Sequence, residues 1–125
     1  MKRDLDLIRD IMLTLEEKMD YKHNMKDSVL LGLLRIEELT SEKLNYHLGL
    51  LCESNFIEAT ELRVFGGDRA YIIRSITQSG HDFIDTFGSK NIWEYAKGNA
   101  IKVGTHTLSF LVEIGKDYLK KQIGL

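Results

Sequence analysis

Histidine, cysteine and carboxylate side chains are the groups in this sequence that could carry acid, base or nucleophilic chemistry. His81 has Ser79 and Asp82 as near neighbours, and His47 lies five residues before Cys52. Neighbouring side chains on one helix cannot converge as nucleophile, base and orienting group, and a separation of five points two side chains in different directions. We therefore expect Cys52 to be a small core residue, His47 to make a structural hydrogen bond, and the chain not to be an enzyme.

Patterns that bind cofactors or metals are also absent from the sequence. Gly66-Gly67 lacks the lysine and the helix that a phosphate-binding loop needs. The one cysteine has no second thiol with which to bind zinc or to form an internal disulfide. We therefore expect no cofactor and no metal, and the single thiol fits a reducing compartment.

Polar and basic side chains that could contact nucleic acid gather between residues 40 and 76. A helix that begins after Thr40 would enter the major groove and offer hydrogen-bonding side chains to base edges. A hairpin after this helix would contribute arginines that contact phosphate groups. The candidate nucleic-acid-binding residues are Ser41, Lys43, Asn45, Tyr46, Arg63, Arg69 and Arg74.

The charge of the same region argues against DNA. Residues 40–76 contain four basic and five acidic side chains, a net charge of −1, whereas a DNA-reading module is usually more positive. Two glutamates on the outward side of the helix would be repelled by phosphate oxygens, and two larger side chains on or beside that side suit a protein contact. The candidate residues for a protein interface are Glu42, Tyr46, Leu50 and Glu53.

A helix, a connector and a short apolar run precede these residues. Apolar side chains recur at helical spacing from Leu5 to Met19, which predicts a helix over residues 3–20. The polar run 20–27 indicates a connector. The apolar run 29–36 is too short for its periodicity to separate a buried strand from a buried helical turn, and this part of the chain stays undecided.

The helix after Thr40 and the hairpin follow directly. Thr40 is a helix-capping residue, and the helix places its apolar side chains on one face. That face carries Leu44, His47, Leu48, Leu51 and Asn55, with Cys52 at its edge, and the opposite face carries Glu42, Tyr46, Gly49 and Glu53. Residues 56–65 and 70–76 are rich in β-branched and aromatic side chains and flank a Gly-Gly-Asp turn, which predicts a β-hairpin. No other strands are predicted.

Three further helices complete the predicted order. Thr77 caps the first, which ends at Gly88; Ser89 begins the second, which Gly104 breaks; and the last begins at Leu108. This order predicts an α+β, mostly helical fold, a winged helix-turn-helix with a β-hairpin wing and additional C-terminal helices. We expect one domain over residues 1–125, with a winged-helix core at about 3–87 and a helical extension at about 89–123.

Length and charge fit a small cytoplasmic protein. A chain of 125 residues can bury a single core without disulfides or metals. No segment resembles a signal peptide or a membrane span, so we expect no contact with membranes. The formal net charge of −2 gives no general attraction to phosphate.

Several segments resemble a family of bacterial and phage proteins of unknown function. The resemblance covers nearly the whole chain and departs from the family between residues 20 and 35, where this chain is longer and more apolar. The resembling segments are residues 1–9, 36–47, 50–51, 55–59, 77–84 and 91–93. The resemblance implies a winged-helix fold and an origin in a phage or prophage, and it implies no biochemical role.

We therefore expect a protein that binds double-stranded DNA as a transcriptional regulator of a phage or prophage. The alternative is a non-catalytic protein-interaction module that forms a homodimer or that binds and inhibits a host protein. The last helix could extend beyond the core into a dimer seam, although we favour the alternative that it packs on the first helix. The seam would consist of Leu108, Leu111, Leu119 and Ile123.

Overall fold

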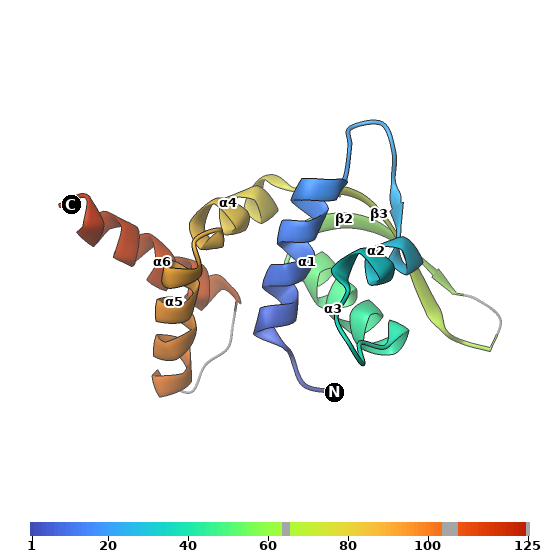
Figure 1. The fold of residues 1–125 in the computed structure, drawn as a ribbon, viewed down its shortest axis with the longest axis horizontal. Coiled ribbons are helices and arrows are strands. Elements are labelled where there is room, and N and C mark those ends of the chain that lie inside the picture. Colours follow the sequence, from blue (N-terminus) through green and yellow to red (C-terminus); the bar gives the residue numbers. More distant parts are fainter. Residues whose placement is uncertain (64–65, 104–107, 125) are drawn as a thin grey trace. The chain divides into compact units, whose positions relative to one another are not determined.

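A computed structural model describes residues 1–63, 66–103 and 108–124, with the side chains of residues 101 and 103 left out. Within these residues the chain forms six α-helices and one three-stranded antiparallel sheet (Figure 1), which confirms an α+β, mostly helical fold. Two compact units divide the chain, residues 1–81 and residues 82–125. The elements are α1 (Leu5–Lys18), β1 (Met25–Lys26), α2 (Asp27–Leu34), α3 (Ser41–Glu53), β2 (Ile57–Arg63), β3 (Arg69–Ile76), α4 (Gln78–Phe87), α5 (Lys90–Val103) and α6 (Leu108–Gln122).

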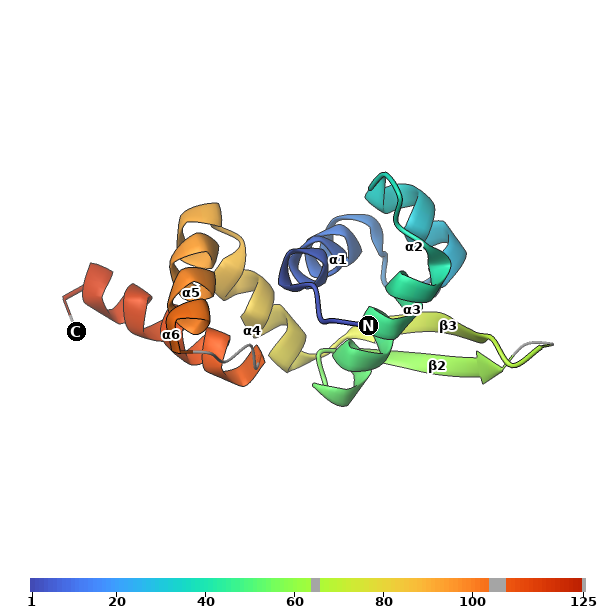
Figure 2. The same cartoon turned by 90° about the horizontal axis from the view of Figure 1, so that it is seen from below.

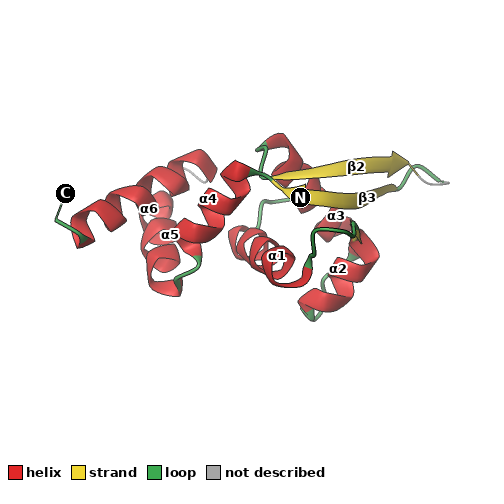
Figure 3. Cartoon of the chain, turned by 90° about the horizontal axis from the view of Figure 1, so that it is seen from above, coloured by secondary structure: helices red, strands yellow, loops and turns green. Residues whose placement is uncertain are grey.

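The first unit packs three helices against a small sheet. The strand order is β1-β3-β2, and both strand pairs are antiparallel. Figure 2 and Figure 3 show α1 and α2 on the same side of the β2–β3 hairpin, and α3 contacts both of these strands. Tyr71 and Ile73, which alternate with less buried residues along β3, point into this core.

Helix α1 supplies the largest share of the first core. The carboxylate of Asp4 caps it by accepting a hydrogen bond from Leu7 N–H at 3.1 Å. Its apolar stripe is buried as the helical spacing predicted, except for Met19, which lies just beyond the helix and is half-buried. The buried stripe includes Ile8, Ile11, Met12 and Leu15. The helix spans residues 5–18, two residues shorter at each end than predicted.

The segment after α1 is more regular than the sequence indicated. The undecided apolar run forms a helix as far as Leu34, and this helix begins before the run, at Asp27. Two residues of the predicted connector form β1, in which Met25 pairs with Ile73. A two-residue strand is too short to show a period, and so the sequence did not reveal it. Where β1 ends, the Asp27 carboxylate accepts a hydrogen bond from Tyr71 N–H at 3.1 Å and continues the pairing of β3.

Helix α3 confirms the predicted cap and the predicted buried face. Thr40 Oγ1 accepts a hydrogen bond from Lys43 N–H at 3.1 Å. Leu44, His47, Leu48 and Leu51 are all buried. Asn55 was wrongly placed on this face, because the helix ends at Glu53 and Asn55 is exposed. Gly49 differs from the prediction, because a side chain added at this position would meet Tyr71 Oη at 3.1 Å. Gly49 therefore faces the hairpin and not the solvent.

The predicted hairpin is also confirmed. Residues 57–63 pair with residues 69–76, and a bulge between Glu58 and Ala59 interrupts the register. Gly66 and Gly67 both adopt positive φ angles, 92° and 88°, which side chains other than glycine rarely tolerate. The predicted end of the first strand, residues 64–65, lies outside the described residues.

Helix α4 begins in the first unit and ends in the second. Thr77 Oγ1 accepts a hydrogen bond from Gly80 N–H at 3.0 Å, as expected of a capping residue, and the helix ends one residue before Gly88. In the second unit Phe87 contacts Phe83 and Trp93 edge-on, with ring centres 5.0 and 5.2 Å apart. These three rings are almost completely buried and form the centre of this unit.

Helices α5 and α6 complete the second unit by packing on each other. Leu111 and Gly115 of α6 are buried, and Gly115 lies against Thr86 and Phe87 of α4. The predicted break at Gly104 lies outside the described residues. Among the described residues, no helix is both long enough and apolar enough to cross a membrane.

Candidate functional site

The exposed face of α3 carries most of the side chains that the sequence singled out. Ser41, Glu42 and Glu53 are exposed, and Tyr46 keeps 41% of its surface open to solvent. Leu50 is half-buried at the edge of this face. Because the period of a helix is 3.6 residues, Glu42, Tyr46 and Glu53 form one stripe, with the aromatic ring between the two acids.

Asn45 does not belong to this exposed face, contrary to our expectation. Its side chain is buried, with 9% exposure, and its Nδ2 donates a hydrogen bond to the backbone oxygen of Arg69 at 2.7 Å. Oδ1 of the same amide has no hydrogen-bond partner among the described residues. Asn45 therefore joins α3 to the start of β3, and in this position it is a positioning residue for the hairpin.

Lys43 is tied to the residue that caps α1. Its Nζ donates to Asp4 Oδ2 at 3.0 Å, and both side chains are more than one-third exposed. Partial burial raises the pKa of Asp4, but the hydrogen bonds from Lys43 and from Leu7 N–H outweigh burial and lower the pKa below its usual value. Lys43 would therefore have to leave its pair with Asp4 in order to contact a ligand.

His47 makes the structural hydrogen bonds that the sequence predicted, and it makes two. Its Nδ1 lies 2.7 Å from Lys43 O, and its Nε2 accepts a hydrogen bond from Asp4 N–H at 2.8 Å. This pattern places the proton of the neutral ring on Nδ1. The side chain is fully buried. His47 thus joins Asp4, at the start of α1, to α3. The exposed Lys2 and Arg3 directly precede Asp4 in the chain.

The structure brings two of the three hairpin arginines together. Arg63 and Arg69 are cross-strand neighbours at the end of the hairpin, and both are exposed. Arg69 Nε lies 3.4 Å from Glu61 Oε1, in a pair that is largely open to solvent. Arg74 lies far along β3, at the bulge, where Glu58 pairs with Ser75 and Ala59 with Ile73. Arg63 and Arg69 therefore form one cationic site, and Arg74 is separate from it.

Sequence reasoning missed Asp4 and the residues before it. Asp4 caps α1 and pairs with Lys43, and its backbone N–H donates to His47. The spacing of 39 residues between Asp4 and Lys43 contains no signal for this contact. The only available hint was that His47, a polar residue on an apolar face, needed a partner.

Cys52 and His81 are two of the side chains that the sequence offered for acid, base or nucleophilic chemistry. Burial raises the pKa of the Cys52 thiol, with further increases from Glu61 and Glu53, and a raised pKa makes a thiol a poorer nucleophile. His81 Nδ1 lies 3.9 Å from Glu16 Oε2 in an exposed pair. Within the described part of the chain, no three histidine, cysteine or acidic side chains are placed to hold a metal ion.

Comparison with known proteins places the chain in a family. The model of a family described as hypothetical proteins, DUF2513, matches residues 2–106, and the chain belongs to this family. It is also similar to an uncharacterized protein of Haemophilus influenzae, with 30% identity over 97 residues that cover 78% of this chain and 76% of the relative. No solved structure matches the chain. Helix α6 follows the matched region.

Proposed function

We propose that the first unit is a winged-helix module that binds double-stranded DNA. The observation that carries this proposal is an exposed, capped helix followed directly by a two-stranded hairpin. The chain order α1-β1-α2-α3-β2-β3, with strand order β1-β3-β2, supports the same assignment. In this module α3 is the recognition helix and the β2–β3 hairpin is the wing.

The contacts divide into base reading and phosphate binding. Ser41 and Tyr46, on the exposed face of α3, are the side chains available to base edges in the major groove. Arg63 and Arg69 at the end of the hairpin contact phosphate groups, and Lys2 and Arg3 supply further positive charge near α3. The hydrogen bond between Asn45 and Arg69 O keeps the helix and the hairpin in one register.

A mobility-shift titration with a pool of random duplexes at low salt tests this proposal. Arg63→Ala and Arg69→Ala should each weaken binding to every sequence and reduce the salt dependence by about one unit of slope. Lys116→Ala, an exposed lysine of α6, is the control for loss of one positive charge. Tyr46→Ala should instead relax the preference between sequences. If the duplexes are not retarded at high micromolar protein, the proposal is wrong.

A second candidate function, binding of a protein partner, rests on a different observation. Tyr46 lies exposed between two acids, while Lys43 and Arg69 are each already paired with a carboxylate. An aromatic anchor with charges at its rim is typical of a protein contact. In this case Tyr46 and Leu50 form the centre of the interface, and Glu42 and Glu53 form its rim.

One double variant separates the two candidates. Glu42 and Glu53 lie about 16 Å apart along α3, since each residue of a helix adds 1.5 Å. If this face meets DNA, changing both residues to glutamine removes repulsion and tightens binding, most strongly at low ionic strength. If it meets a protein, the same change slows or weakens that association. Two titrations of the double variant distinguish these outcomes. One uses DNA, and the other uses protein partners that the wild-type chain captures and the Tyr46→Ala variant does not.

A further inference from the structure

Helix α2 leaves apolar side chains in solvent. It is the most apolar helix of the chain, yet Leu30 is its only buried residue among those described. Val29 is 50% exposed, Gly32 is exposed, and Leu33, one turn after Val29, is half-buried. Ile36, just beyond the end of the helix, is 38% exposed. We call Val29, Gly32, Leu33 and Ile36 the α2 surface. A contiguous apolar surface of this kind marks an interaction site.

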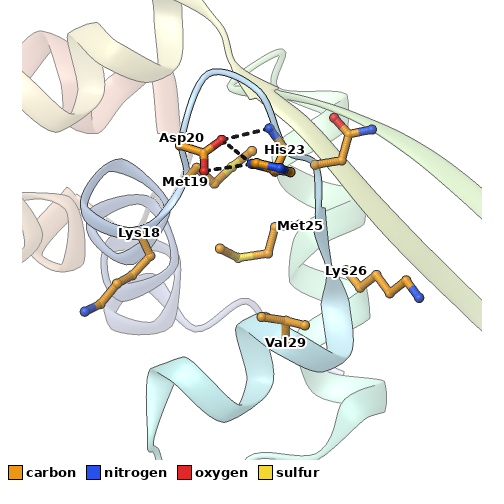
Figure 4. Close-up of a pocket in the computed structure, with 8 residues that line it drawn as sticks. Lys18, Met19, Asp20, His23, Met25, Lys26 and Val29 are labelled. Atoms are coloured by element: carbon orange, nitrogen blue, oxygen red, sulfur yellow. Dashed lines mark hydrogen bonds and ion pairs between the residues drawn. The ribbon is translucent and has the colours of Figure 1, made fainter.

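A basic hollow adjoins one end of the α2 surface. It has a volume of about 360 Å³, and Val29 lies in its wall beside Met19 and Met25 (Figure 4). Lys18 and Lys26 stand at its rim, and Lys18 also lies 3.7 Å from Glu17 in an exposed pair. The acid in this hollow, Asp20, is paired with His23 at 2.9 Å. With His23 neutral, two lysines and one acid give the lining of this hollow a net charge of +1.

An acidic hollow adjoins the other end. It has a volume of about 420 Å³, and Ile36 lies in its wall with Leu7 and Leu39. Five acids and one lysine line it, a net charge of −4, and the lysine is Lys43 in its pair with Asp4. The acids are Asp4, Asp6, Asp10, Glu37 and Glu38. One apolar surface thus connects two hollows of opposite charge.

We propose that a second copy of this chain docks on the α2 surface, antiparallel to the first, about a two-fold axis that passes beside Gly32. A two-fold axis places the same surface on both copies, so each end of one copy meets the opposite end of the other. The lysines of one copy then lie on the acids of the second, at both ends. A parallel arrangement would set like charges together, which is unfavourable.

Gly32 suits the point where the two helices cross. A side chain built at this position would meet nothing within 4 Å, so its own fold does not require a glycine there. Glycine in a helix interior lowers stability, and its absence of a side chain allows another backbone to approach closely. An antiparallel pairing centred beside Gly32 brings the Val29 end of one helix beside the end of the second copy's helix, where Ile36 follows. It also brings Lys26 toward the acidic hollow of the second copy, in whose wall Glu38 lies.

This dimer does not depend on the proposed function. It would exist whether α3 reads DNA or binds a protein. If α3 does read DNA, the two-fold axis presents two copies of α3 and requires a site with matching two-fold symmetry. Loss of dimerisation with DNA binding retained, or the reverse, would distinguish failure of one inference from failure of the other.

Sedimentation velocity of the full chain, from low to high micromolar concentration, tests the surface. The wild type should show a reversible monomer–dimer equilibrium. Val29→Glu should raise the dissociation constant by at least about tenfold, because it buries a charge in the apolar contact. Leu62→Glu is the matched control, since Leu62 is 42% exposed on β2, and it should leave the equilibrium unchanged. Far-ultraviolet circular dichroism verifies that both variants are folded.

Charge exchange tests the antiparallel register. Lys26→Glu and Glu38→Lys should each weaken the dimer, because each variant places like charges opposite one another at both ends of the interface. A mixture of the two single variants should associate more tightly than either variant alone, since both junctions of the mixed dimer then carry opposite charges. A chain that stays monomeric at every concentration overturns the proposal. So does a dimer that Val29→Glu leaves intact and Ile123→Glu abolishes, because this result puts the interface on the C-terminal helix.

Discussion

Among single residues, Asp4 makes three contacts that join α1 to α3. Its carboxylate caps α1 and pairs with Lys43, while its backbone N–H donates to His47. A carboxyl whose pKa is lower in the folded chain adds stability above the pKa of the unfolded chain, and this contribution is lost as the pH falls through the folded pKa. Asp4 therefore contributes to the acid side of the stability curve.

We predict that Asp4→Asn lowers the free energy of unfolding at pH 7. Asparagine caps a helix about as well as aspartate, so the variant isolates the loss of charge beside Lys43. The difference from the wild type should begin to shrink as the pH falls below the usual aspartate pKa of about 4, and it should disappear once the pH has fallen through the lower pKa of the folded Asp4. Urea unfolding between pH 7 and pH 3 measures it. A difference that stays constant over this range would contradict the prediction.

Asp10 provides a control of opposite sign on the same helix. Burial raises the pKa of Asp10, Arg9 lowers it, and Asp6 and Asp4 raise it, so that its net pKa lies above the usual value. A raised carboxyl pKa means that stability is lost as the pH rises through it. Asp10→Asn should therefore raise stability at pH 7 and lose this advantage at low pH.

Asn45 is predicted to matter for the hairpin and not for ligand contact. Asn45→Ala removes the hydrogen bond to Arg69 O and should cost about 1 kcal/mol of stability. Amide hydrogen exchange around residues 69–71 should become faster, because β3 loses its tie to α3. Tyr46→Ala, at the next residue, is the control and should change stability by no more than about 0.5 kcal/mol. Equal effects of the two variants would disprove the distinction.

Among helices and strands, an element that packs against one surface was easier to predict from the sequence than an element that packs against two. Helix α1 buries one stripe, and its spacing revealed it. Helix α3 packs against helices on one face and against the hairpin on a second, which buries Asn45 and places Gly49 on Tyr71. Helical periodicity identifies the apolar face, but a polar or small residue on a second buried face looks like surface.

The shortest elements could not be predicted for a related reason. β1 has two residues, and its pairing with β3 depends on a chain reversal that no local pattern encodes. After Asp27 and Ser28, every residue of α2 is apolar or glycine, on both the buried and the exposed sides, so the spacing contains no period. The α2 surface explains this pattern if a second copy covers it, since a helix that is apolar all round is a buried helix.

Two glycines in helices should respond oppositely to alanine. Gly32→Ala should raise the stability of the monomer by about 0.5–1 kcal/mol, because the site is open and alanine is the better helix former. Gly80→Ala should lower stability by about 1–3 kcal/mol, because its new side chain would overlap the backbone of Phe56 and crowd Ile76 and Met12. Thermal unfolding at low protein concentration compares them. A stabilising Gly80→Ala would refute this packing.

For the molecule as a whole, one helix contributes residues to both compact units. Gly80 of α4 lies against Phe56 and Met12 of the first unit, and Phe83 and Phe87 of the same helix form the ring cluster of the second. Unfolding of the first unit removes the packing that holds the start of α4. We therefore retain the prediction that residues 1–125 unfold as one cooperative domain.

The single tryptophan makes this prediction measurable. Trp93 is 1% exposed in the second unit, so its fluorescence follows that unit, whereas circular dichroism follows all the helices. Leu48→Ala empties a fully buried position of the first unit and should cost about 2–5 kcal/mol. In one cooperative domain this variant shifts the fluorescence midpoint and the circular dichroism midpoint by the same amount in urea. An unchanged Trp93 transition beside a shifted circular dichroism transition would show that the two units unfold independently, because a change confined to one core then leaves the other core at its original stability.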